Sequence, residues 1–441
     1  MTYVLGIDIG ACSTGAAIVR IGGGADAATL DLGSEAARAA SALFLAEDGR
    51  VLAGDAAAAA GRGCPERLAR GFKSRLGDSV PLAVGQTLVP PEELFAAMAR
   101  WVVTTVEARE GAPAAAVALT HPRGWGGYRV SVARRALAET GLAHAFLLSE
   151  PEAAALHHSA GNPLDPGSII AVCDLGGSVE ATVLRRNVLG QNVLRQNKDT
   201  GADRDTAEFE TLGFEAGGRA DGGDLGAGLD DVVFRRVLEA VGGPVEALNM
   251  DDPKAVSALW QVRRDCTAAK EALSRDADAS VKVVLPGLRE HVPLTRTEFE
   301  TRAEHLLREA AGVLGRALQS ADVAVEDLAA VILTGGSARI PLAERILAEE
   351  AGAGVVVDAD PASVTARGAA LAAAAHLRAG VGTQAVVASV LTVHGTAARP
   401  HPHDLGLLAP GAPTVEAGGI LYIPVPRPRT AAGAVASPSG A

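Results

Sequence analysis

One stretch near the start of the chain sets the fold, and it reads VLGIDIGACSTGAAIVR, residues 4–20. An apolar run delivers Asp8 to a turn of glycine and small residues, and a second apolar run returns from that turn. The pattern predicts a β-hairpin that carries a carboxylate at its turn. Such a turn lets successive backbone N–H groups approach an anion closely, because few side chains stand in the way.

The same arrangement recurs at residues 170–186, which read IAVCDLGGSVEATVLRR. Asp174 takes the place of Asp8, and the distance along the chain from Asp174 to Arg186 equals that from Asp8 to Arg20. We interpret the two copies as an internal duplication in register. Two such hairpins facing each other would grip the phosphates of a nucleotide, with both carboxylates available for a metal or its water shell. A single copy would equally suit an ordinary hairpin with an exposed Asp, so the interpretation depends on the recurrence.

Length and charge narrow the class of protein. The chain has 441 residues, which suggests two or three domains, and 48% of them are hydrophobic, enough for a sizeable core. Its net charge of -12 and pI near 5.4 argue against a nucleic-acid partner, and no basic run is present. No apolar run reaches the roughly 18 residues of a membrane helix, so we expect no membrane insertion.

The remaining compositional signals favour a cytoplasmic protein. The four cysteines are widely spaced and provide neither a metal knuckle nor a disulfide framework. The start of the chain lacks the charged and apolar regions of a signal peptide, so we expect none.

Strand and helix patterns alternate along most of the chain, which predicts an α/β fold with mainly parallel sheets covered by helices. We predict domain boundaries at residues 1–165, 166–378 and 379–441. The last segment is rich in Pro, Ala and Gly, and we expect at most a vestigial β segment there, with a disordered end. Weak periodicity at 187–223 predicts a mobile loop.

Five segments together resemble the seventy-kilodalton heat-shock chaperones of the DnaK type, within the actin-like ATPase superfamily. In order they are residues 6–10 (GIDIG), 72–77 (FKSRLG), 149–155 (SEPEAAA), 174–177 (DLGG) and 335–341 (GGSARIP). The resemblance covers roughly residues 3 to 377. It implies an actin-like ATPase fold of two lobes, each built on a duplicated ribonuclease H-like sheet with helices, and a nucleotide cleft between them.

The resemblance also implies roles for individual residues. ATP or ADP and Mg2+ would be the cofactors, and the metal's water shell would be held by Asp8 and Asp174. Catalytic roles around the γ-phosphate and the attacking water would fall to Lys73, Glu150, Asp174 and Glu180. The nucleotide itself would be contacted by Gly10, Ala11, Cys12, Gly176, Gly177, Gly226, Lys270, Ser274, Gly335, Gly336, Ser337 and Arg339.

The chain departs from the family pattern at several of these positions. Ala11 and Cys12 stand where the family has two threonines, so hydroxyl contacts to phosphate are lost. The second turn is one residue shorter, with Ser178 in place of a Gly-Thr pair, and Glu180 replaces an Asp. Further replacements are Ala227, Thr267 and Glu271. Small misplacements in phosphoryl transfer can cost about a hundredfold in rate, so we expect slow hydrolysis or none.

These observations lead to one function and three alternatives. We expect an ATP-binding, chaperone-like protein that hydrolyses ATP slowly and switches between open and closed lobes, with an unknown protein client or partner. After Arg378 only 63 residues follow (441 minus 378), so we expect no full peptide-binding domain. The alternatives are a pseudo-ATPase scaffold, a small-molecule kinase of the same superfamily and, less favoured, a filament-forming protein.

Overall fold

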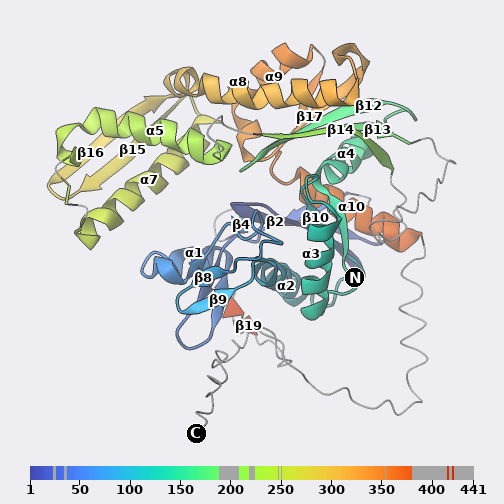
Figure 1. Ribbon diagram of the computed structural model, residues 1–441, viewed down its shortest axis with the longest axis horizontal. Helices are drawn as coiled ribbons and strands as arrows, with labels where there is room; N and C mark the ends of the chain where they lie inside the picture. The colour runs from blue at the N-terminus through green and yellow to red at the C-terminus, as the bar shows by residue number, and fades with distance from the viewer. Residues whose placement is uncertain are drawn as a thin grey trace, which may run out of the picture.

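The computed structural model describes residues 1–22, 26–33, 37–187, 208–217, 224–246, 248–249, 251–352 and 354–379, together with two short strands at 415–416 and 420–421. Figure 1 shows two α/β halves, one above the other, with α4 (Glu150–Gly161) and α10 (Val364–Arg378) between them. The arrangement confirms the predicted α/β class.

The first half is built on a mixed sheet. Its strands are β1 (Tyr3–Ile9), β2 (Ser13–Arg20), β3 (Ala28–Leu30), β4 (Ala39–Ala40), β10 (Val117–His121) and β11 (Phe146–Ser149). They lie in the order β11-β10-β1-β2-β3, and β4 also pairs with β2. β1 and β2 form the predicted hairpin, while β10 runs parallel to both β1 and β11. Two helices, α2 (Pro91–Glu110) and α3 (Gly127–Glu139), pack on one face through a large aliphatic cluster.

The second half repeats this plan. Its strands are β12 (Ile169–Leu175), β13 (Val179–Arg186), β14 (Phe209–Gly217), β17 (Leu328–Thr334) and β18 (Val355–Val357). Their order is β14-β13-β12-β17-β18, which matches the order of the first sheet strand for strand. In each sheet the Asp-bearing hairpin is followed by two parallel strands. Two helices, α8 (Arg296–Ala321) and α9 (Pro341–Ala351), cover the outer face of the second sheet.

Each half also carries a smaller appended part. The first contains β5 (Leu43–Leu45), β6 (Val51–Ala53), α1 (Gly54–Ala60), a 3-10 turn at Pro65–Arg67, β7 (Leu68–Ala69), β8 (Leu82–Val84) and β9 (Thr87–Val89). The second contains α5 (Leu225–Val241), α6 (Gly243–Glu246), α7 (Pro253–Leu273), β15 (Asp278–Leu285) and β16 (Leu288–Thr295). Short 3-10 turns lie at Val325–Asp327 and Gly336–Arg339.

The two hairpins differ in register by one residue. Four residues separate the last pair of the first hairpin, Ile9 and Thr14, whereas three separate Leu175 and Val179 in the second. The expected in-register duplication is therefore corrected: Arg185, not Arg186, is the counterpart of Arg20 in the ladder. The shorter second turn accounts for the shift, and a shift of one residue exchanges the two faces of a strand.

Strands lie within the predicted loop and within the predicted tail, where a vestigial β segment was expected. Within the expected loop at 187–223, residues 209–217 form β14 at the edge of the second sheet, while 188–207 and 218–223 lie outside the described residues. Of the predicted tail after residue 379, the structure describes β19 (Val415–Glu416) and β20 (Ile420–Leu421). β20 pairs with β6 of the first half. The expected disordered end lies outside the described residues.

The two sheets are held together by the crossing of α4 and α10, which we call the hinge. α10 packs on the first sheet through alanines, and α4 packs on the inner face of the second sheet. Gly6 of β1 lies so close to α10 that an added Cβ would be 2.2 Å from the backbone nitrogen of Ala370. At the crossing itself, a Cβ on Gly368 would be 1.7 Å from the carbonyl oxygen of Ala153. The helices can approach this closely because the contact surfaces are glycine and alanine.

No helix within the described part of the chain is both long and apolar enough to cross a bilayer. The predicted domain boundaries remain predictions.

We predict that Gly368→Val will lower the free energy of unfolding by at least about 3 kcal/mol, because its side chain cannot fit without separating α4 from α10. Urea denaturation measures the change. Gly315→Ala in α8 is the matched control: an added Cβ there meets nothing within 4 Å, and alanine should stabilise an exposed helix position by about 0.5–1 kcal/mol. Equal stability of Gly368→Val and the parent would contradict the close crossing.

Candidate functional site

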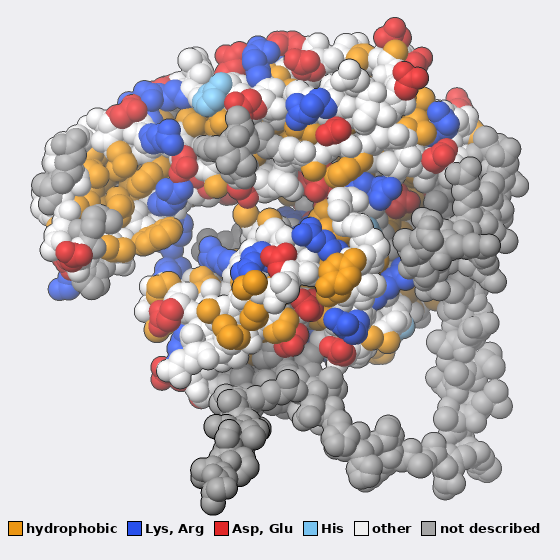
Figure 2. All heavy atoms as spheres, viewed as in Figure 1, with side chains coloured by type: hydrophobic (Ala, Val, Ile, Leu, Met, Phe, Trp, Pro, Cys, Tyr) orange, Lys and Arg blue, Asp and Glu red, His pale blue; other side chains and the backbone are white. Residues whose placement is uncertain are grey.

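The turns of the two hairpins lie against each other. An added Cβ on Gly177, in the second turn, would be 3.0 Å from the Cβ of Ala11 in the first. The carbonyl of Gly177 accepts a hydrogen bond from the N–H of Leu225 at 3.0 Å, which ties the second turn to the start of α5. Figure 2 shows the surface hollowed between the lower half and the overhanging part that carries α5 and α7. The two predicted phosphate turns therefore meet at one place.

Asp8 is a buried carboxylate with a partner on each oxygen. Thr120 donates its hydroxyl to Oδ1 at 2.9 Å, and Arg38 donates to Oδ2 at 3.0 Å in an ion pair. Burial alone would raise the pKa of Asp8, but the charges of Arg38 and Lys73 outweigh it and hold the pKa below its ordinary value. Asp8 is thus an anion with a cation beside it.

Asp174 occupies the matching place in the second sheet but has a different environment. Thr334 donates to its Oδ1 at 3.3 Å, and Gly335 packs so tightly that an added Cβ would be 2.5 Å from the same oxygen. Gly335 has a φ of 86°, which also favours glycine. Among the described residues no ion pair to Asp174 is present. Burial and the nearby Asp8 charge raise the pKa of Asp174 to about 6.

Lys73 and Glu150 form a buried ion pair near Asp8 and Asp174. The Lys73 Nζ lies 2.5 Å from Oε1 of Glu150, the first residue of α4. Burial opposes the charge on Lys73, but Glu150 and Asp8 outweigh it and raise the pKa of the ammonium group. Burial, with Asp8, Asp174 and Glu180 nearby, raises the pKa of Glu150 despite the lysine. The lysine is therefore a fixed positive charge within a group of carboxylates.

Glu180 completes this cluster. It lies directly opposite Asp174 in the ladder of β12 and β13. Burial and the Asp174 charge raise its pKa to about 7, so its protonation state changes near neutral pH. The structure thus brings together all five predicted catalytic and metal-binding side chains: Asp8, Lys73, Glu150, Asp174 and Glu180.

The predicted nucleotide-contacting residues lie around the two turns, and they differ in whether their backbone N–H groups are free to bind a phosphate. The N–H of Gly10 is used within its own turn, where it donates to Ser13 at 3.0 Å. No hydrogen bond among the described residues uses the N–H of Gly176 or Gly177. Gly226 opens α5, whose capping residue Asp224 accepts from the N–H of Ala227 at 2.9 Å.

On the expected base side, some side chains already have partners. Lys270 forms an ion pair with Asp230 at 2.7 Å. Its positive charge also acts to lower the pKa of the Cys12 thiol in the first turn. Ser274 caps α7 one turn after Lys270. Ser337 is buried, while an added Cβ on Gly336 would meet nothing within 4 Å. Arg339 forms an ion pair with Asp360, so it is not free to contact a base in this conformation.

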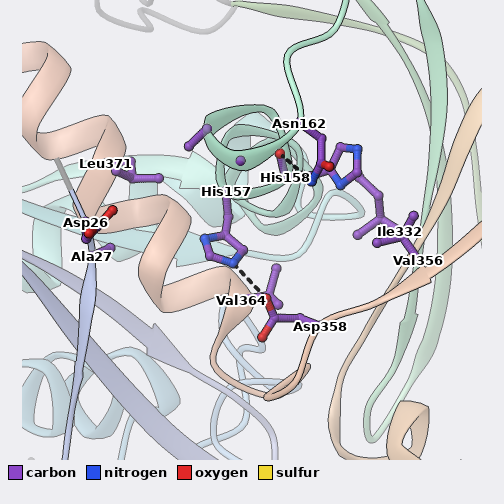
Figure 3. A pocket seen from close by; sticks show the side chains of 12 residues that line it. Asp26, Ala27, His157, His158, Asn162, Ile332, Val356, Asp358, Val364 and Leu371 are labelled. Carbon is purple, nitrogen blue, oxygen red and sulfur yellow. Dashed lines mark hydrogen bonds and ion pairs between the residues drawn. The ribbon is translucent and has the colours of Figure 1, made fainter.

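A separate cavity lies at the hinge. Its volume is about 330 Å³, and none of the predicted site residues lines it. Figure 3 shows His157 pointing from α4 toward Asp358, with 3.0 Å between Nε2 and Oδ2. Arg367 of α10 also donates to Asp358, at 3.1 Å. This cavity belongs to the joint between the halves and not to the carboxylate cluster.

Sequence reasoning missed four polar residues of the cluster's surroundings: Arg38, Thr120, His121 and Thr334. Thr120 and Thr334 come at or near the carboxyl ends of strands parallel to the Asp-bearing ones, which is where ligand sites form in such sheets. That rule could have found them. Burial lowers the pKa of His121 to about 4, so it stays neutral beside Lys73. Arg38 follows no pattern that the sequence alone reveals.

A sequence model of the Hsp70 protein family matches residues 222–391. Over this stretch the chain resembles the Hsp70 family. Its two matching sheets, with the carboxylate cluster between them, are the actin-like ATPase fold that the Hsp70 domain shares. This confirms the predicted family and fold.

Several curated relatives are chaperone proteins named HscA homolog. The one from Aromatoleum aromaticum is 27% identical over 396 residues, which cover 84% of this chain and 57% of the relative. Those from Bordetella petrii and Burkholderia mallei are 31% and 32% identical, each over 52% of this chain and 32% of the relative. The chain thus spans about half the length, or less, of the curated relatives that it matches.

The donors present suit a magnesium ion held with a nucleotide. Mg2+ keeps several waters and is bound by one or two carboxylates together with phosphates. Asp174 has an oxygen not committed to an ion pair, and Asp8 faces the same cluster. Within the described residues no three His, Cys, Asp or Glu side chains form a metal centre by themselves. The arrangement fits a metal shared with phosphate better than a metal caged by protein.

We predict that Lys73→Met will lower the free energy of unfolding by about 3 kcal/mol at pH 8 and by less at pH 5.5. Without the ammonium group the pKa of Glu150 rises further, so the folded protein binds a proton that the unfolded chain releases above its ordinary pKa of 4.5. Stability of the variant therefore falls as pH rises through that interval. Urea denaturation at both pH values measures the difference. Adding Glu150→Gln should restore part of the loss; a deficit independent of pH would refute this account.

Proposed function

We propose that this protein binds ATP and ADP with Mg2+ between its two lobes and acts as a chaperone-like nucleotide switch with slow hydrolysis. One observation carries the proposal: the turns of the two hairpins meet beside a cluster of Lys73 and four carboxylates, two of which are buried and two half-buried. The glycine turns supply uncommitted backbone N–H groups for phosphate, and the carboxylates supply sites for a metal and for an attacking water.

Each residue has a definite part in this proposal. Asp174 and Asp8 hold the magnesium ion, which when bound neutralises phosphate charge. Lys73 orients the terminal phosphate and the water, because its ammonium group is fixed by Glu150 at 2.5 Å. Glu180, with a pKa raised to about 7, accepts a proton from that water.

The remaining predicted residues bind the rest of the nucleotide. Phosphates are received by the two turns, at Gly10, Ala11, Cys12, Gly176 and Gly177, and by Gly226 in the first turn of α5. The N–H of Gly10 must first release the carbonyl of Ser13. The ribose and base are received by Lys270, Ser274, Gly335, Gly336, Ser337 and Arg339. Arg339 and Lys270 must first release Asp360 and Asp230, with which each is paired.

The wider biology is also part of the proposal. The relatives' names support a protein client, which the switch would hold or release as the lobes move about the hinge. All four cysteines are free thiols, which suits a cytoplasmic, reducing compartment. We propose no nucleic-acid partner, in keeping with the net charge of -12.

A second candidate is a nucleotide-binding scaffold that does not hydrolyse ATP. It is favoured by the first turn, where Ala11 and Cys12 offer no hydroxyl group. In that case nucleotide binding alone would set the lobe position.

Single-turnover ATP hydrolysis and equilibrium ADP binding, both with Mg2+, test the proposal. We expect the parent to bind ADP. Lys73→Ala should bind ADP with an affinity within a few-fold of the parent's but should lose about a hundredfold or more in turnover. Asp174→Asn should lose at least tenfold in affinity for ADP. Lys282→Ala and Asp278→Asn, at exposed positions of β15, are the matched controls.

The outcomes separate the candidates. A parent protein that binds neither ADP nor ATP would refute both. Binding with turnover no faster than in Lys73→Ala would refute the ATPase and leave the scaffold.

A further inference from the structure

Arg38 is the second cation of the carboxylate cluster, and all three nitrogens of its guanidinium group donate hydrogen bonds. It directly precedes β4, and its Nε donates to the hydroxyl of Ser13 at 2.9 Å. Nη2 donates to the Ser13 carbonyl at 2.6 Å and to Asp8 at 3.0 Å. Nη1 donates to the carbonyl of Ala362, two residues before α10 begins, at 2.5 Å. The guanidinium therefore joins the first phosphate turn, a predicted metal ligand and a segment next to the hinge.

Two glycines make the slot that holds this guanidinium. An added Cβ on Gly15 would be 2.6 Å from Nη1, and one on Gly10 would be 3.2 Å from Nη2. Gly15 lies directly opposite Asp8 in the ladder, whereas the residue opposite Asp174 is Glu180. The two copies have thus diverged: Asp8 faces a slot filled by a cation, and Asp174 faces a second acid.

Arg38 contacts the segment 358–363, which also contacts Gly335 beside Asp174 and both helices of the hinge. Gly335, which packs on Asp174, donates its N–H to Pro361 at 3.2 Å. Asp358 binds His157 of α4 and Arg367 of α10, as Figure 3 shows for the histidine. Through this segment, Arg38 connects the surroundings of Asp8 with those of Asp174 and with the hinge.

We propose that Arg38 is a positioning residue with two effects. It serves as the resident cation of Asp8, so that binding of a divalent metal depends mainly on Asp174. It also ties Asp8 to the 358–363 segment. The proposal rests on the proposed nucleotide site, because the metal would arrive with the nucleotide. Because Arg38 and Asp8 form an ion pair at 3.0 Å, loss of this cation must change metal binding measurably.

The first test uses the nucleotide-free protein and Mg2+ alone. In Arg38→Gln, Asp8 becomes an unpaired anion beside Asp174, and the pair should attract the metal. We expect 10 mM Mg2+ to raise the melting temperature of Arg38→Gln by about 3 °C or more and to leave the parent within about 1 °C. Adding Asp174→Asn should abolish the rise. Arg38→Lys keeps the positive charge but lacks the planar guanidinium group, and its response to Mg2+ should resemble that of the parent.

Arg20→Gln is the matched control, since Arg20 lies on the same hairpin and pairs with Glu110 in an exposed ion pair. Equal effects of Mg2+ on the parent, Arg38→Gln and Arg38→Lys would overturn the resident-cation proposal. This readout needs no nucleotide, so its failure is distinct from failure of the proposed function.

The second test measures the ratio of ADP dissociation constants without and with Mg2+. We expect this ratio to be at least about tenfold larger in Arg38→Gln than in the parent, because the variant lacks a positive charge that assists metal-free nucleotide. Amide exchange at 358–363 should also be faster in Arg38→Gln than in Arg20→Gln. An unchanged ratio would overturn the metal part of the proposal, and unchanged exchange would overturn the tie to 358–363. If Arg38→Gln does not fold, Arg38→Lys decides the tie, since it cannot reach Ser13, Asp8 and Ala362 together.

Discussion

The close crossing of α4 and α10 is the constraint on which the rest of the structure depends. Gly368 lies against the Ala153 carbonyl, and each helix packs on the inner face of one sheet. The distance between the sheets is therefore set by backbone contact. Glu150, at the start of α4, is placed by the same helix and reaches Lys73 of the first half. A change at the crossing would move the ion pair as well as the sheets.

Electrostatics then explain why the site is organised around cations. Four carboxylates share two positive side chains, Lys73 and Arg38. Asp8 and Glu150 are buried, and Asp174 and Glu180 are half-buried. Burial raises the pKa values of Asp174 and Glu180 because no ion pair neutralises either of them within the described residues. A site with this excess of acid gains stability from an added cation, and phosphates would in turn be held by that cation and by the turns.

The sequence predicted the parts of this arrangement that have local causes. The hairpins around Asp8 and Asp174 were predicted from apolar runs and glycine turns, and motifs identified Lys73 and Glu150. The sequence did not predict β14, because its pattern Phe209–Gly217 lacks regular alternation, and its edge position depends on packing against α8. It also misjudged the register of the second hairpin by one residue, since equal spacing along the chain does not fix which residues pair. Arg38 was missed because its role depends on Gly15 and Ala362, which are far from it in sequence.

The divergence of the two hairpins follows from that one-residue shift. The shorter second turn places Glu180 opposite Asp174. In the first hairpin the longer turn places Gly15 opposite Asp8, and Arg38 fills the space. A duplicated motif has thus produced one carboxylate with a built-in cation and one without. A metal ion is attracted to a carboxylate whose charge is not neutralised by a neighbouring cation. The geometry of a turn therefore decides which of two similar aspartates binds the metal more strongly.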